Sequence, residues 1–296
     1  MARLDPYKAH LDRADLLLDL GRSSEALAEA RRAIGLDAQR AAGWFEACRA
    51  LLALEEGAGA LEHADAGLSR SPQSSWGHRL RSTSLTQLGR HPEALSEANE
   101  AVKLSPQEPL ALRRRARCLY MLDEEVEALR QTEEAIGLDP ENAYGYSLRG
   151  DILAYLGRLS EAEASFREAL GHSPEQADLH RRLGDVLRRQ ERHPEALTTY
   201  RSTIALDPTD KRARAGFRAS AEQVEGAGVV DKRIMALIVA SFGVGFLIAR
   251  WWVTGGVLLL LAGGLVVLPR VWNRRRLRLR EPELWALWQR IRGDRR

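Results

Sequence analysis

Residues 88–109 read LGRHPEALSEANEAVKLSPQEP, and residues 122–143, which lie 34 positions further on, read LDEEVEALRQTEEAIGLDPENA. Both stretches open with polar turn residues after a leucine, continue with Glu-Ala-Leu and then reach a proline at the same position, Pro106 and Pro140. Apolar and small residues recur between these markers at the spacing of one helix face, and the proline stops the helix. Two copies at this offset predict a repeated helical element.

The same offset of 34 residues extends over most of the chain. One column holds alanine six times, and a second column always holds a small residue. These columns are Ala26, Ala60, Ala94, Ala128, Ala162 and Ala196, and Ala14, Cys48, Ser82, Ala116, Gly150 and Gly184. Six repeats fit within 7–210 without an insertion: 7–40, 41–74, 75–108, 109–142, 143–176 and 177–210. Because one such repeat cannot bury its apolar face alone, the period predicts stacked repeats.

Each repeat reads as helix, turn, helix. Pro92 and Pro194 stand where a second helix would begin, a position that tolerates the missing N–H. The pattern resembles the tetratricopeptide repeat (TPR) family over about two thirds of the chain. The resemblance implies a right-handed superhelix whose concave face is lined by the first helix of each repeat. The family's aromatic residue at the fourth position survives only as Trp44 and Tyr146, and Glu56-Gly57-Ala58-Gly59 reads as a loose, Gly-rich turn.

The net charge of +3 hides two different regions. Residues 232–296 carry 13 basic and 3 acidic residues, whereas the rest of the chain is acidic. This distribution excludes a nucleic-acid binder built on an overall basic domain. The two cysteines are too few for a disulfide framework or a four-cysteine zinc site. The 40 arginines against 4 lysines indicate a GC-rich bacterial genome.

Residues 232–270 predict a transmembrane hairpin with spans at about 234–249 and about 252–268. One helix over both spans would be about 50 Å long, well beyond a hydrocarbon core of about 30 Å. Trp251 and Trp252 suit the membrane interface at the hairpin tip. Ser241, Gly245 and Ala249 form a small-residue stripe that suits packing within the hairpin, with dimerisation as the alternative.

The charges that flank this hairpin predict its topology. Lys232 and Arg233 precede the first span and six arginines follow the second, which places both ends in the cytoplasm by the positive-inside rule. The absence of an apolar run near Met1 argues against a signal peptide and agrees with this topology. We expect a multi-pass protein of the bacterial inner membrane, with the repeats on the cytoplasmic side.

Residues 211–231 predict a solvent-facing capping helix that ends near Gln223 and a linker that begins at Glu225. Residues 271–296 predict a basic cytoplasmic tail in which a Trp- and Arg-rich amphipathic helix begins at Pro282. Such a helix beside a membrane suits the lipid interface; the alternative is that it folds back on the repeats. The fold class expected is therefore all-α: a TPR superhelix of six repeats plus a capping helix, two transmembrane helices and a short amphipathic helix.

No pattern for catalysis, metal binding or cofactor binding accompanies the repeats. The chain has no GxSxG, HExxH or phosphate-loop motif. Cys48 and Cys118 fit packing positions, and His10, His78 and His180 recur too many repeats apart to share a metal. We therefore expect no enzyme, no cofactor and no metal.

The concave positions of the family, taken as 2, 5, 9 and 12 of each repeat, are the candidate binding site. In repeats 2 to 5 they hold a mixture of arginines and aromatic residues, joined by Leu110. The candidate groove residues are Phe45, Arg49, Trp76, Arg79, Arg113, Arg117, Tyr120 and Tyr144. This composition is favoured at binding hot spots, although the arginines can also simply keep the surface soluble.

The charges of this groove indicate the kind of ligand. The arginines suggest an extended ligand that bears carboxylates, whereas Asp12, Asp15 and Asp19 occupy the repeat 1 end, so the two ends differ in sign. No repeat has Lys at position 5 with Asn at position 9, the pair with which some TPR domains clamp the C-terminal carboxylate of chaperones.

The function expected is a membrane-anchored scaffold or adaptor that binds a protein or peptide partner and contacts lipid through its C-terminal region, with no nucleic-acid partner. Two alternatives remain open. The hairpin can oligomerise into a pore or transporter subunit that the repeats assemble or gate; the absence of charge within either span weighs against an ion path. The repeats can also hold an enzyme at the membrane as an assembly factor.

Overall fold

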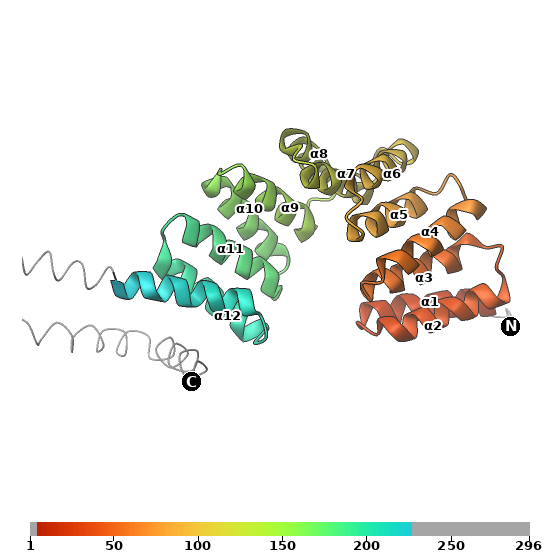
Figure 1. The fold of residues 1–296 in the computed structure, drawn as a ribbon, viewed down its shortest axis with the longest axis horizontal. Coiled ribbons are helices and arrows are strands. Elements are labelled where there is room, and N and C mark those ends of the chain that lie inside the picture. The colour runs from red at the N-terminus through yellow and green to blue at the C-terminus, as the bar shows by residue number, and fades with distance from the viewer. Residues whose placement is uncertain (1–4, 227–296) are drawn as a thin grey trace, which may run out of the picture. The chain divides into compact units, whose positions relative to one another are not determined.

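The computed structural model describes residues 5–226, and within them the chain forms thirteen helices and no strand (Figure 1). Twelve helices form six consecutive pairs: α1 Pro6–Asp19 and α2 Ser23–Leu36, α3 Ala41–Ala53 and α4 Gly57–Arg70, α5 Ser75–Gln87 and α6 His91–Leu104, α7 Pro109–Met121 and α8 Glu125–Leu138, α9 Ala143–Tyr155 and α10 Leu159–His172, α11 Ala177–Arg189 and α12 His193–Leu206. The thirteenth helix is described over 211–226. Residues 5–226 thus form an all-α fold of about six helical pairs and a final helix.

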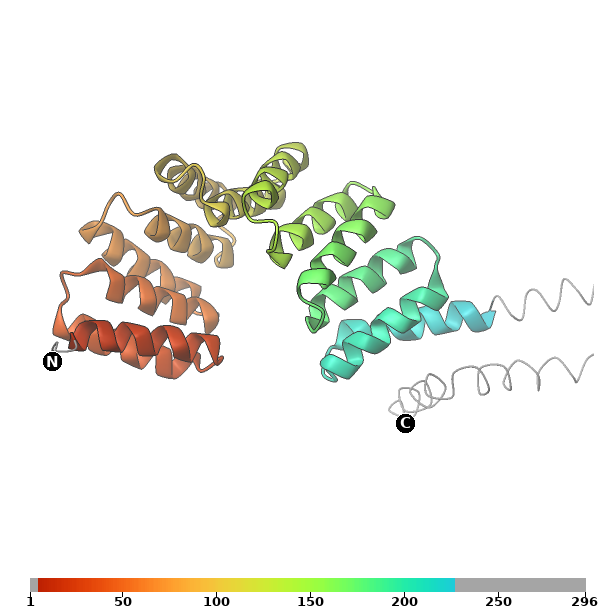
Figure 2. The ribbon, with the colours of Figure 1, turned by 180° about the vertical axis from the view of Figure 1, so that it is seen from behind.

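The chain divides into two compact units, Met1–His172 and Ser173–Arg296, which we call unit 1 and unit 2. The described part of unit 1 holds the pairs from α1 to α10, and that of unit 2 holds α11, α12 and the final helix. In unit 1 each helix contacts its pair mate and the next pair, and each first helix also contacts the first helix of the next pair. Both views show α1 to α4, in red and orange, stacked side by side (Figures 1 and 2).

The two helices of a pair approach closely because small residues occupy their contact. The six alanines from Ala26 to Ala196 are fully buried, and so are the small residues of the column that begins at Ala14. Where that second column holds glycine, an aromatic ring fills the space. A Cβ on Gly150 would lie 2.8 Å from Cε1 of Phe166, and a Cβ on Gly184 would lie 2.8 Å from Cε1 of Tyr200. A glycine on the first helix therefore faces an aromatic ring on the second, and the contact remains close-packed.

Prolines and turn residues set the starts of the second helices. Pro92 in α6 and Pro194 in α12 occupy the first turn, which confirms the expectation from sequence. Before the second helix of each pair one residue adopts a positive φ. Gly21, Gly89 and Gly157 do so in alternate repeats, and Glu55, Asp123 and Glu191 do so in the others. A non-glycine residue in this left-handed region costs about 1 kcal/mol or more.

The Gly-rich stretch in repeat 2 corrects one expectation. Gly57 and Gly59 lie in the first turn of α4 instead of forming a loose turn. Gly57 is buried, and a Cβ there would lie 3.2 Å from Cβ of Gln87 in α5. The glycine thus permits close packing between neighbouring pairs, and this packing outweighs its weak helix propensity.

The final helix also differs from the expectation. It continues through 226, beyond the predicted end near Gln223, so Glu225 and Gly226 are helical. Its face is not fully exposed to solvent, because Ala213, Phe217 and Ser220 are buried. The rest of the predicted linker lies outside the described residues.

Several predicted features fall outside residues 5–226: the hairpin at 232–270 with its stripe Ser241, Gly245 and Ala249, the tip residues Trp251 and Trp252, and the tail at 271–296. Among the helices that the structure describes, none is long and apolar enough to cross a membrane.

The positive φ angles predict a stability difference that can be measured. Glu55 has φ of 61° and is exposed, so Glu55→Gly should raise the free energy of unfolding by about 0.5–1 kcal/mol by removing backbone strain. The matched control is Gly89→Ala, where φ is 73° and a Cβ would meet no atom within 4 Å, so only the backbone strain changes. It should lower stability by about 1 kcal/mol. Urea denaturation of both variants tests this, and midpoints that move in the same direction would contradict it.

Candidate functional site

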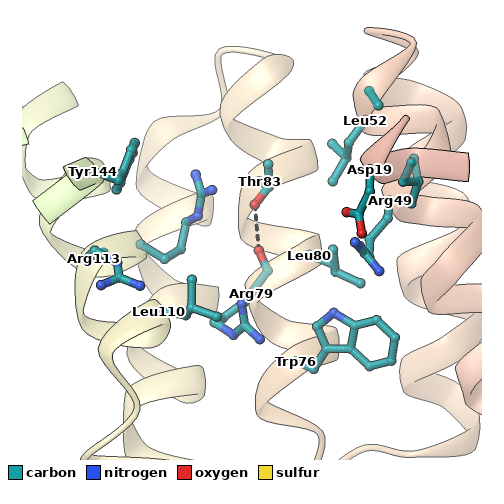
Figure 3. A pocket seen from close by; sticks show the side chains of 13 residues that line it. Asp19, Arg49, Leu52, Trp76, Arg79, Leu80, Thr83, Leu110, Arg113 and Tyr144 are labelled. Carbon is teal, nitrogen blue, oxygen red and sulfur yellow. Dashed lines mark hydrogen bonds between the residues drawn. The ribbon is translucent and has the colours of Figure 1, made fainter. Parts of the chain in front are cut away.

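Unit 1 contains a cavity of about 440 Å³ that is lined by the first helices of five consecutive pairs (Figure 3). Five of the eight predicted groove residues line it: Arg49, Trp76, Arg79, Arg113 and Tyr144. Eight further residues complete the lining: Leu18, Asp19, Leu52, Ala53, Leu80, Thr83, Leu110 and Arg114. The cavity combines arginines, aromatic rings and leucines, a composition that suits the side chains of a peptide.

The cavity crosses the helices diagonally. It meets α1 at its last two residues, Leu18 and Asp19, and α3 near its C-terminal end. It then crosses α5 from Trp76 to Thr83 and meets α7 in its N-terminal half. Tyr144 in the first turn of α9 closes the far end. The opposite ends of the cavity thus lie near opposite ends of helices.

Arg79 occupies the middle of the cavity and is held by a resident carboxylate. Its Nη2 lies 2.9 Å from Oε1 of Glu108, whose Oε2 accepts a hydrogen bond of 2.7 Å from Ser75. Burial lowers the pKa of Arg79; Glu108 opposes this shift, whereas Arg114, Arg113 and Arg49 reinforce it by repulsion. The Nε of Arg79 is buried and has no hydrogen-bond partner in the described structure. Several arginines thus lie close together in the middle of the cavity, around a guanidinium whose buried Nε lacks a partner among the described residues.

Arg113 is far less accessible than the sequence suggested. It is only 3% exposed, and its Nη1 donates a hydrogen bond of 2.9 Å to Oδ2 of Asp139. Its Nε lacks a partner among the described residues. Arg113 contributes chiefly to the structure of the cavity wall, because it ties α7 to the C-terminal end of α8.

Arg49 is the third predicted arginine of the cavity, and two carboxylates surround it. Its Nη1 lies 2.8 Å from Asp15 of α1 and 2.9 Å from Glu46 of its own helix. Burial raises the pKa of Glu46, and Arg49 opposes that shift. The positive charge of Arg49 is therefore largely neutralised within the protein.

Arg114 is the functional candidate that sequence reasoning missed. It lines the cavity from α7, it is partly exposed, and it has no ion-pair partner within residues 5–226. It occupies position 6 of its repeat, which the family positions 2, 5, 9 and 12 omit. The signal was present in the sequence, because a residue four places after Leu110 lies on the same helix face.

Phe45 also differs from the expectation. It is 2% exposed and lies in the core instead of lining the groove. A Cβ on Gly77 would lie 2.6 Å from Cζ of Phe45, so the glycine makes room for the ring. Trp76 packs edge-on against this ring with 5.2 Å between centroids. Phe45 therefore supports the cavity wall from behind through Trp76.

Arg117 and Tyr120 lie outside the cavity. The guanidinium of Arg117 lies 6.0 Å from the centroid of the Tyr120 ring and 3.8 Å from Asp151. Tyr120 packs edge-on against Tyr155 with 5.8 Å between centroids. Of the eight predicted groove residues, five thus line the cavity, Phe45 lies in the core behind it, and Arg117 and Tyr120 lie outside it.

The described residues hold no cluster of three or more His, Cys, Asp or Glu side chains that could bind a metal. Nδ1 of His10 lies 2.6 Å from Glu29, and Nδ1 of His78 lies 2.8 Å from Glu97, so each histidine pairs with a carboxylate of its own helix pair. Cys48 and Cys118 are buried, and burial raises the pKa of the Cys48 thiol to about 12. A thiol in this state is a poor nucleophile.

Stacked helical pairs with a cavity along their first helices define an α-helical repeat protein. The tetratricopeptide repeat model matches residues 11–75, 80–143 and 147–211, and the chain belongs to this family. TPR domains act as scaffolds for protein or peptide binding and are typically non-catalytic.

Solved structures share the fold at low sequence identity. A thermophilic TPR protein from Thermus thermophilus is 24% identical with a TM-score of 0.58, and the match covers 61% of this chain and 98% of that one. A chain of the APC/C hetero-tetramer Cut9-Hcn1 is 16% identical with a TM-score of 0.67, and the match covers 72% of this chain and 42% of that one. The type IV pilus biogenesis factor PilW gives 15% identity and a TM-score of 0.61, covering 72% and 98%. No curated protein matches the sequence.

The two neighbouring arginines of α7 should differ in their effect on stability. Arg113→Ala leaves Asp139 without its buried partner and should lower the free energy of unfolding by about 2 kcal/mol. Arg114→Ala breaks no ion pair of the described structure and should change it by less than about 0.5 kcal/mol. Urea denaturation measures both values, and equal losses would contradict the assignment of Arg113 to the wall and Arg114 to the binding surface.

Proposed function

We propose that this chain is a membrane-anchored TPR scaffold that captures a protein or peptide partner in the cavity of unit 1. The observation that carries the proposal is the lining of that cavity by five first helices, which contribute Trp76, Leu110 and Tyr144 as well as Arg114. Leu110 is 50% exposed and Tyr144 is 45% exposed. Large apolar side chains this accessible, next to a cation without a partner in the described structure, supply both area and a polar anchor for a ligand.

The ligand that we propose is an extended segment that bears a carboxylate. Arg114 offers planar, bidentate hydrogen bonding to such a group. Arg79 adds positive potential, although Glu108 already binds one edge of its guanidinium. Burial lowers the pKa of Arg79, and repulsion from the neighbouring arginines adds to this shift; the binding of an anion would relieve that repulsion.

The membrane part of the proposal rests on sequence. The uncharged stretches at about 234–249 and about 252–268, flanked by basic residues, support a hairpin with both ends in the cytoplasm. The stripe Ser241, Gly245 and Ala249 and the tip residues Trp251 and Trp252 belong to this anchor. We place the repeats at the cytoplasmic face of a bacterial inner membrane, with the basic tail on anionic lipid and without any catalytic activity of the chain itself.

In the alternative function, the hairpin is the functional part of the protein and forms a pore or transporter subunit. Its oligomers would show in the mass of the full-length protein purified in detergent. A closed ring would support the pore, whereas a monomer would contradict it.

The groove is tested by capture of partners from native membranes with tagged full-length protein. Arg114→Glu combined with Tyr144→Ala should reduce recovery of the proteins bound by the wild type at least about tenfold, because it removes one charged and one aromatic contact. The control is Arg130→Glu, which reverses an exposed arginine of α8 outside the cavity. Undiminished capture by the groove variant would place the binding surface elsewhere. Arg113 is unsuitable for this test because of its buried ion pair.

The anchor is tested by deletion of 232–296. We expect the shortened chain to leave the membrane fraction and to keep the helical circular dichroism of stacked repeats, because the apolar spans are gone and the repeats bury their own core. Membrane association without these residues would contradict the hairpin anchor. Loss of helical structure would contradict an independently folded repeat domain.

A further inference from the structure

We propose that the cavity of unit 1 recognises a peptide that carries two opposite charges, with a cationic side chain at the α1 end and a carboxylate at the α7 end. This inference rests on the proposed function and extends it, since it adds a second charge and an orientation to the ligand. The cavity, its resident ion pairs and the directions of its helices carry the argument.

The resident ion pairs leave two charged side chains of the cavity unmatched. Arg49 pairs with Asp15 and Glu46. Arg79 pairs with Glu108, and Arg113 pairs with Asp139. Asp19 and Arg114 also line the cavity, and neither has an ion-pair partner among residues 5–226. One anion and one cation therefore remain for a ligand.

Asp19 and Arg114 stand at opposite ends of the cavity. Asp19 is the last residue of α1, whereas Arg114 lies in the N-terminal half of α7. The close view shows Asp19 beside Arg49 on one side and Tyr144 beside Arg113 on the other (Figure 3). Helix α5, which stacks between α3 and α7, contributes Trp76 and Leu80 to the lining, and both offer apolar contact.

The helix ends reinforce both charges. The C-terminal end of a helix carries partial negative charge, and the last turn of α1 has no basic side chain to offset it. The N-terminal end carries partial positive charge, and the first turn of α7 has no acidic side chain. Glu108 immediately before α7 is acidic, but Arg79 binds it. A cation is thus favoured near Asp19 and an anion near Arg114.

Two buried donors also point to a ligand, the Nε of Arg79 and the Nε of Arg113. Arg113 is 3% exposed and lines the cavity, yet its Nε has no hydrogen-bond partner in the described structure. A buried donor without a partner is costly. A ligand carboxylate beside Arg114 would place a negative charge near these buried donors.

The test measures binding of capped synthetic peptides to the full-length protein in detergent at low salt, by fluorescence anisotropy. The probes are peptides in which one Lys and one Glu are separated by two, four or six residues of Leu, Tyr and Ala, together with peptides of the same length that carry two Glu or two Lys. The best mixed-charge peptide should bind roughly three- to tenfold more tightly than either like-charge peptide. This preference should fade as salt is raised.

Charge reversal in the protein should change this preference in a defined way. Asp19→Lys should favour the two-Glu peptide, Arg114→Glu should favour the two-Lys peptide, and the double variant should restore the mixed-charge preference. The control is Asp12→Lys, which reverses an exposed aspartate of the same helix outside the cavity. It should leave the preference unchanged.

The outcomes separate this inference from the proposed function. If Asp19→Lys leaves the preference unchanged while Arg114→Glu abolishes binding of the Glu-containing peptides, the cavity reads an anion alone. The two-charge inference then fails and the proposed function stands. If neither reversal affects binding, or if no peptide binds at about 1 mM, the cavity is not the recognition site and both fail.

Discussion

The close contact between the two helices of each pair is the constraint on which the rest of the structure depends. Small residues in the columns that begin at Ala14 and Ala26 let the backbones approach, and every member of both columns is buried. This contact leaves the opposite face of each first helix free. Because the pairs stack in the same order, the free faces of α1, α3, α5, α7 and α9 meet along one side of unit 1 and enclose the cavity.

The same constraint explains how the cavity wall is supported. Where one helix has a glycine at a contact, an aromatic ring of a neighbouring helix fills the space that a side chain would occupy. The ring of Phe166 lies over Gly150, that of Tyr200 over Gly184 and that of Phe45 over Gly77. Phe45 is thereby drawn into the core, and Trp76 lies against it at the surface of the cavity. A residue that a repeat template assigns to the binding face can therefore act from behind it.

The helical pairs could be predicted from the sequence because their signals are local and occur six times. The binding face was harder to predict because its accessibility depends on contacts between repeats. Arg113 is bound by Asp139, which lies 26 residues further along the chain, and Arg79 is bound by Glu108, so neither guanidinium is fully accessible to a ligand. No column of the repeat reveals such pairs, since the acidic partners occur in some repeats and not in others. Arg114 was missed because the prediction considered only positions 2, 5, 9 and 12 of each repeat. Arg114 is at position 6, although it shares a helix face with Leu110.

The polarity of the cavity follows from architecture as much as from individual residues. First helices that repeat in one direction present their C-terminal ends on one side of the stack and their N-terminal ends on the other. A cavity that runs straight across them would meet equivalent turns and have no net direction. The cavity of unit 1 instead runs diagonally from the last turn of α1 to the first turn of α9. It therefore passes from C-terminal helix ends, which carry partial negative charge, to N-terminal helix ends, which carry partial positive charge. Asp19 and Arg114 have the same signs as the helix ends near which they lie, so side chains and backbone favour the same orientation of a ligand.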